Sequence, residues 1–63
     1  MEIHLGDIRR QKELTVRKLS ELSGVSIGQI SNVETGKVSP TLDVVCKLSK
    51  ALGVSPYELF TCD

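Results

Sequence analysis

Aromatic residues are nearly absent from this 63-residue chain, which has one Phe, one Tyr and no Trp. Proteins that bind single-stranded nucleic acid stack the bases on aromatic side chains, so this composition argues against such a role. No stretch approaches the roughly 18 consecutive apolar residues that a membrane-spanning helix needs. The first residues also lack the basic stretch and apolar run of a secretory signal. We therefore expect a protein that works in the cytoplasm and not in a membrane.

Side chains that bind metals or act as nucleophiles are also scarce. His4 is the only histidine, and the two cysteines, Cys46 and Cys62, lack the close spacing of a metal site and are too few for a disulfide framework. Cys46 lies in an apolar stretch, where a free cysteine usually behaves as a small hydrophobic residue. No nucleophile and base, carboxylate pair or phosphate-binding loop can be assembled from what remains. We expect no metal, no cofactor and no enzymatic activity.

The charges of the chain balance, with 8 basic and 8 acidic residues. The isoelectric point of about 6.5 lies below the value above about 9 that is typical of a basic nucleic-acid-binding domain. A cluster of basic residues nevertheless occurs early in the chain: Arg9, Arg10, Lys12, Arg17 and Lys18. We predict weak non-specific attraction to DNA.

Short apolar patterns at helical spacing, separated by Gly, Ser and Pro, fill the chain. They predict one all-α domain over residues 1–63, with five helices and no strand. The first helix is expected over residues 3–12, the second from a cap at Thr15 to Gly24, and the third from a cap at Ser26 to Gly36. The fourth is expected to begin with Ser39 as cap and Pro40 at its first position and to end at Gly53, and the last to follow Ser55-Pro56.

The same spacing predicts which side chains are buried. Ser26 and Gln29 match a capping box, in which each side chain bonds the other residue's backbone amide. The residues expected in the core are Leu5, Ile8, Leu19, Leu22, Val25, Ile30, Val33, Leu42, Val45, Leu48 and Leu52. Leu59 and Phe60 are expected in the last helix, and because so short a helix has no other reason to be apolar, they are the candidates for a contact between two copies.

Only residues 23–25 separate the second expected helix from the third. So short a turn, with a glycine and then an apolar residue, makes two helices cross and pack on a shared core, as in a helix-turn-helix unit. This unit is expected over about residues 16–35. The outer face of its second helix carries no charge and suits base edges better than phosphates: Ile27, Gly28, Gln29, Ser31 and Asn32.

The stretch from Gly24 to Gly36, GVSIGQISNVETG, resembles the central motif of the Cro/CI-type phage-repressor helix-turn-helix family. Leu5, Ile8 and Arg9, then Leu14, Thr15 and Leu19, and the segment from Ser39 to Val54 extend the resemblance over nearly the whole chain. It implies a five-helix, lambda-repressor-like domain that binds double-stranded operator DNA as a homodimer. It also implies a regulator of transcription, most simply a repressor.

The resemblance also implies roles for individual residues. Ile27, Gly28 and Asn32 match positions that read bases, with Gln29 and Ser31 beside them. The residues expected to contact phosphates are Thr15, Arg17, Lys18, Ser26, Thr35, Lys37, Ser39 and Thr41. Arg9 and Glu34 match a pair that the family uses as an internal ion bridge, so for these two the implied role is structural.

Several positions depart from the family pattern. Val16 stands where a Gln commonly begins the second helix and contacts a phosphate, and Glu13 stands where a Gly often ends the first helix in a left-handed conformation. Ser20 and Ser49 replace inward-facing alanines, so each hydroxyl would need a backbone carbonyl as acceptor. An alternative function is therefore a protein-interaction module of the same fold, either an anti-repressor or an antitoxin-like partner with weak or no DNA binding.

Overall fold

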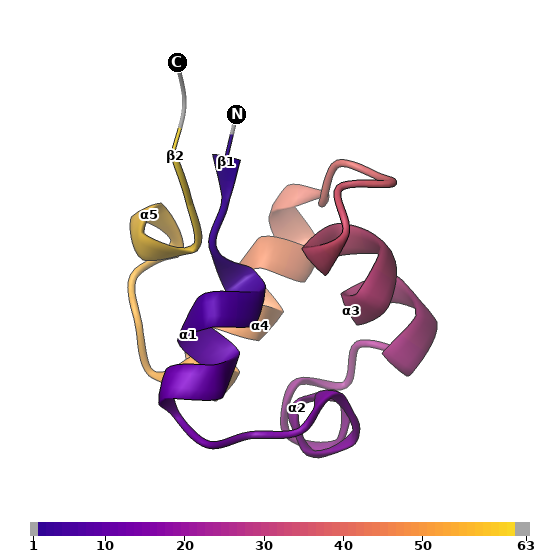
Figure 1. Cartoon of the computed structure of the whole chain (residues 1–63), viewed down its shortest axis with the longest axis vertical. Helices are drawn as coiled ribbons and strands as arrows, with labels where there is room; N and C mark the ends of the chain where they lie inside the picture. The colour runs from indigo at the N-terminus through magenta and orange to yellow at the C-terminus, as the bar shows by residue number, and fades with distance from the viewer. Residues whose placement is uncertain (1, 62–63) are drawn as a thin grey trace.

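The computed structural model describes residues 2–61, in which five helices surround one core (Figure 1). The elements follow in the order β1 (Glu2–Ile3), α1 (Leu5–Gln11), α2 (Val16–Ser23), α3 (Ile27–Glu34), α4 (Leu42–Leu52), α5 (Pro56–Leu59) and β2 (Phe60–Thr61). In Figure 1, α1 lies in front of α4, while α3 and α5 lie on opposite sides of them. The predicted fold class, an all-α architecture of five helices, is confirmed.

Local signals determine where several helices begin and end. The Thr15 hydroxyl accepts the Lys18 amide at 3.0 Å at the start of α2, and Gly24 ends that helix with a φ of 78°. Few residues other than glycine adopt this left-handed conformation. At α5 a full capping box is present, because the Ser55 amide also donates to the Glu58 carboxylate at 2.8 Å. These boundaries agree with the prediction.

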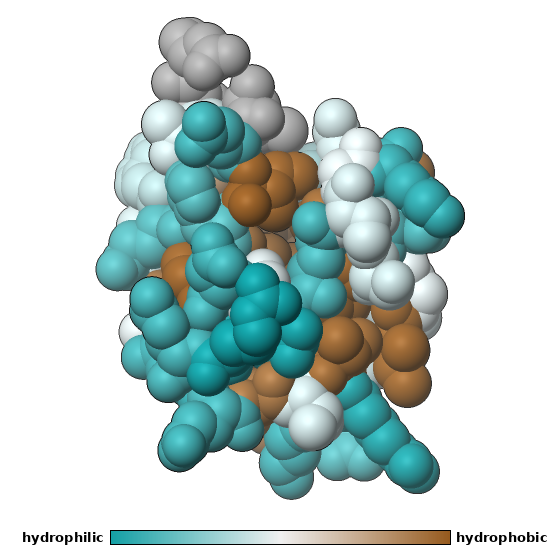
Figure 2. Space-filling view, in the orientation of Figure 1, coloured by the Kyte–Doolittle hydropathy of each residue, from teal (hydrophilic) through white to brown (hydrophobic). Residues whose placement is uncertain are grey.

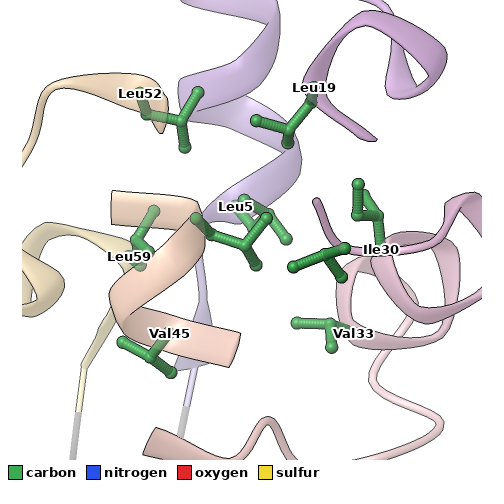
Figure 3. Packing of buried hydrophobic residues seen from close by; sticks show 9 residues of the cluster. Leu5, Leu19, Ile30, Val33, Val45, Leu52 and Leu59 are labelled. Atoms are coloured by element: carbon green, nitrogen blue, oxygen red, sulfur yellow. The ribbon is translucent and has the colours of Figure 1, made fainter. Parts of the chain in front are cut away.

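Apolar side chains from every helix meet in the centre of the molecule (Figure 3). The most deeply buried are Leu5, Leu19, Ile30 and Leu48, each at most 1% exposed. Burying one side chain of this size stabilises the fold by roughly 1.5–3 kcal/mol. The full set is Leu5, Leu19, Val25, Ile30, Val33, Val45, Leu48, Leu52 and Leu59. This core fixes α2 and α3 relative to each other.

The two ends of the described chain pair as short strands, so the predictions of no strand and of a first helix beginning at residue 3 are wrong. Ile3 lies opposite Phe60 in an antiparallel ladder. The His4 amide donates to the Leu59 carbonyl at 2.6 Å, and the His4 Nε2 lies 2.8 Å from the Thr61 hydroxyl. Phe60 therefore belongs to β2 and not to the last helix. Two-residue strands are too short for any alternating pattern to reveal them.

The start of α4 differs from the prediction. Thr41, and not Ser39, caps the helix, because its hydroxyl accepts the Val44 amide at 3.3 Å. Pro40 consequently precedes the cap. Leu42 now begins the helix, where its side chain extends beyond the core and is 83% exposed. Its predicted burial is wrong for this reason.

Two further side chains expected inside lie at the surface. Leu22 is 52% exposed, because the inward side of α2 is formed by Leu19 and its partly buried neighbours. Cys46 is exposed, since it follows the buried Val45 by about 100° around the helix. Cys62 lies outside the described residues.

Two of the departures from the family pattern have the predicted structural outcome. Glu13 has a φ of 58°, the left-handed conformation that a non-glycine residue adopts only at a cost of about 1–2 kcal/mol. Ser49 is 4% exposed, and its hydroxyl donates to the Cys46 carbonyl at 3.0 Å. The buried hydroxyl is therefore satisfied, and α4 accepts a serine in its inward face.

Candidate nucleic-acid interface

A turn of three residues joins α2 to α3. The turn comprises residues 24–26, one position later than predicted, because Ser23 still belongs to α2. The Ser23 hydroxyl accepts the amide of Val25, whose side chain is 2% exposed, so the turn is tied to both the helix and the core. The short turn and the buried Val25 therefore fix where α3 begins relative to the end of α2.

The start of α3 is held by one half of the predicted capping box. The Ser26 hydroxyl oxygen accepts the Gln29 amide at 3.1 Å. The reciprocal bond to the Ser26 amide is not formed, since the Gln29 side-chain oxygen instead accepts the hydroxyl hydrogen at 3.4 Å. A hydroxyl can donate and accept at once, so the single Ser26 side chain satisfies both groups. Both side chains remain exposed at the surface.

The two sides of α3 differ sharply in burial. Ile30 and Val33 point into the core, at 0% and 4% exposed. On the other side, all five residues predicted to read bases are exposed: Ile27, Gly28, Gln29, Ser31 and Asn32. Figure 2 shows near-neutral and hydrophobic residues over α3, whereas the surface over α1 is mainly hydrophilic. The outer face of α3 is therefore an uncharged surface on a rigid helix.

An ion bridge ties the end of α3 to α1. The Nε of Arg9 donates to the Glu34 carboxylate at 2.6 Å, and both side chains are only 13% exposed. A second guanidinium nitrogen of Arg9 donates to the Leu14 carbonyl at 2.8 Å. This is the bridge that the family resemblance implies. Because it binds the only acidic residue of α3, no free negative charge remains on this helix.

The eight residues predicted to contact phosphates are all exposed. They lie in three segments: the start of α2, the turn, and the stretch from the end of α3 to the start of α4. Arg17 and Lys37 form no ion pair with another described residue, and Lys18 lies 3.8 Å from the Glu21 carboxylate. The hydroxyl of Thr35 donates to the Ser31 carbonyl at 2.9 Å, so its hydrogen is already used within the helix.

A shallow hollow lies between α3 and the start of α4. It is lined by Gln29, Val33, Val38, Ser39, Pro40, Thr41 and Val44, so it brings one predicted base-reading residue beside two predicted phosphate contacts. The structure leaves Thr15, Arg17 and Lys18 at the other end of the helix-turn-helix unit, at the start of α2.

Two exposed apolar residues near this hollow were missed by the sequence analysis. Val38 is 48% exposed, and Leu42 follows the cap of α4. The signal for the second was present: Thr41 is a good cap, and Asp43 lies two residues later in the first turn, where negative charge is favoured. Recognising that cap would have placed Leu42 outside the core.

Within residues 2–61, no group of three His, Cys, Asp or Glu side chains is placed to hold a metal ion. Among the helices described, none is both long enough and apolar enough to cross a membrane.

Two helices joined by a short turn, with a buried inner side and an uncharged, exposed second helix, define a helix-turn-helix protein. The family model for the helix-turn-helix matches residues 5–59, which is most of the chain. The chain belongs to this family, and the predicted resemblance to its Cro/CI-type members is confirmed.

Regulators of transcription are among the proteins to which the chain is similar. It is 42% identical over 57 residues to the HTH-type transcriptional regulator PuuR of Escherichia coli (strain K12), a match that covers 90% of this chain and 31% of PuuR. It is 41% identical over 54 residues to the uncharacterized HTH-type transcriptional regulator y4dJ of Sinorhizobium fredii, covering 86% of this chain and 70% of that protein. The chain thus spans less than a third of the length of PuuR.

A solved structure has the same fold. The crystal structure of the restriction-modification controller protein C.AhdI from Aeromonas hydrophila superposes with a TM-score of 0.86 at 35% identity, covering 90% of this chain and 86% of that one. Together with the family match and the regulators above, this agrees with the prediction that the chain is not an enzyme.

Proposed function

We propose that residues 1–63 act as one DNA-binding domain of a transcriptional regulator, most simply a repressor, that inserts α3 into the major groove of operator DNA. The observation that carries this proposal is the contrast between the two sides of α3. Its inner side is held by Ile30, Val33 and the Arg9–Glu34 bridge, while its outer side is exposed and uncharged. Because this face carries no charge, α3 can approach base edges without the free-energy cost of desolvating a charged side chain.

Each part of the outer face suits a different contact. The Asn32 amide can form two hydrogen bonds with adenine, and the exposed Ile27 side chain can pack against a thymine methyl group. Gln29 and Ser31 supply further donors and acceptors. Lys37 and Arg17, which have no acidic partner among residues 2–61, would bind phosphates and set the position of α3 without reading sequence.

The relatives support this proposal, since two of them are named as HTH-type transcriptional regulators and the solved structure is that of a controller protein. By analogy we place the action of this domain on DNA in the cytoplasm.

The proposed assembly is a homodimer, but its predicted contact needs revision. Leu59 is 3% exposed and packs in its own core, so it is not free to contact a second copy. The exposed apolar side chain of α5 is Tyr57, at 86%. We therefore assign the contact to Tyr57 and the half-buried Phe60. Two copies would read half-sites about 34 Å apart on one side of the duplex.

A binding selection from random duplex DNA tests the proposed function. We expect enrichment of one sequence with two-fold symmetry, and sedimentation across a concentration series should show reversible dimers. A strict monomer that protects only one half-site would contradict the homodimer. A selection that enriches no sequence would contradict DNA recognition itself.

The protein-interaction module remains the second candidate, because the balanced charge gives DNA little long-range attraction. Under that function the outer face of α3 would contact a protein. The same selection separates the two, since an anti-repressor or antitoxin-like partner without DNA affinity enriches nothing.

A further inference from the structure

At four of the five glycine positions, the fold itself explains why the residue is a glycine. Three adopt a positive φ: Gly24, Gly36 and Gly53. At Gly6, an added Cβ would lie 3.3 Å from a Glu34 carboxylate oxygen. Gly28 has neither reason: it lies within α3 without a positive φ, and apart from its chain neighbours and the backbone of its own helix no atom lies within 4 Å of an added Cβ. Since glycine weakens a helix relative to alanine, the fold alone would favour alanine here.

The position of Gly28 on the helix suggests why this residue is a glycine. At about 100° per residue, Gly28 lies roughly opposite the buried pair Ile30 and Val33, at the most outward point of α3. Asn32 follows one turn later on the same side. Side chains on a helix lean toward its N-terminus, so we expect the Asn32 amide to extend toward Gly28. The absent side chain leaves bare backbone beside that amide.

We infer that Gly28 is a specificity-determining residue, whose bare backbone admits the base pair that Asn32 reads. This inference rests on the proposed function. Hydrogen bonds from Asn32 to a base need donor–acceptor distances of about 2.7–3.2 Å. A methyl group at residue 28 would stand between the helix and the groove and hold the base edge beyond that range. Gly28 therefore weakens the helix slightly and permits the close approach.

The test compares the same substitution at two glycines. Gly28→Ala should raise the melting temperature by a few degrees, because it removes backbone freedom from the unfolded chain without a clash. It should also weaken binding to the selected duplex roughly tenfold or more, the range expected when a base contact is lost. The matched control is Gly6→Ala in α1, where the added Cβ would face the Glu34 and Arg10 side chains and not the outer face of α3. Measured well below its melting temperature, its affinity should equal that of the parent.

A double-mutant cycle tests whether Gly28 acts through Asn32. In the Asn32→Ala background, Gly28→Ala should cost little further affinity, because the contact that it obstructs is already gone. Equal losses in both backgrounds would overturn the inference, as would parental affinity in Gly28→Ala when Asn32→Ala binds weakly. If the parent itself selects no duplex, the proposed function fails, a result distinct from these two.

Discussion

The inner and outer sides of α3 differ in how much they contact the rest of the fold, although they belong to one eight-residue helix. Every inner residue has a partner in the fold: Ile30 and Val33 in the core, and Glu34 on Arg9. Among the described residues, the outer ones have almost no partners outside their own helix: Ile27, Gly28, Gln29, Ser31 and Asn32. A substitution on the inner side should therefore change stability, whereas one on the outer side should change binding. This separation can be tested one residue at a time.

The largest effect is expected at the inner end of the helix. Arg9→Ala leaves the Glu34 carboxylate without its partner in a site that is only 13% exposed. We expect the free energy of unfolding to fall by up to about 3–5 kcal/mol, measured by thermal and denaturant melts. Arg10→Ala is the matched control, since its pair with Asp7 is exposed and should contribute less than about 1 kcal/mol. Equal melting temperatures for both variants and the parent would show that the bridge is ordinary surface charge.

The next effect is expected on the outer side. Asn32→Ala should weaken binding to the selected duplex by about 1–3 kcal/mol and relax the preference at one base pair. Its melting temperature should match that of the parent, because the side chain is exposed. Titrations against single-base variants of the duplex measure both quantities. If affinity and preference are unchanged, α3 is not the reading helix, and the protein-interaction module becomes the better account.

A smaller and complementary change is Ile30→Val, which removes one methyl group from a fully buried side chain. We expect a loss of about 0.5–1.5 kcal/mol in the free energy of unfolding. The base preference should not change, because the backbone of α3 stays in place. An altered preference, measured on the same single-base variants, would mean that the two sides of the helix are coupled.

The smallest change is expected at the border of the outer face. Lys37→Ala should weaken binding to all sequences alike and reduce the slope of log affinity against log salt by about one unit. Lys50→Ala, in the last turn of α4, is the control with the same change in charge and should leave the slope unaltered. A sequence-dependent loss at Lys37 would instead place this side chain against a base.

Local chemistry explains which parts of the fold were predictable. Thr15 and Ser55 cap helices by bonding amides two or three residues away, so both caps can be read from neighbouring residues. The β1–β2 pair joins residues almost sixty positions apart, as in Ile3 and Phe60, and no local pattern encodes it. At α4 two local signals conflict: Ser39-Pro40 suggests a helix that starts at residue 40, whereas Thr41 followed by Asp43 suggests the start that the structure has.

The candidate site was predictable to a similar degree. Helical periodicity alone placed Ile30 and Val33 inside, and therefore the base-reading candidates outside. The Arg9–Glu34 bridge came only from the family resemblance, because either charge taken alone suggests a solvated surface. The contrast between Gly28 and the other glycines required the structure, since backbone angles and neighbouring atoms are not visible in a sequence.

The pairing of β1 with β2 brings the two ends of the described chain side by side, with Glu2 opposite Thr61. A circular permutant that links the two ends and opens the exposed turn between α1 and α2 should keep every helix in place. Opening there would also free Glu13 from its left-handed conformation. The order in which the helices are synthesised would then change while the outer face of α3 is conserved, so this fold can be used to ask whether translation order matters to folding.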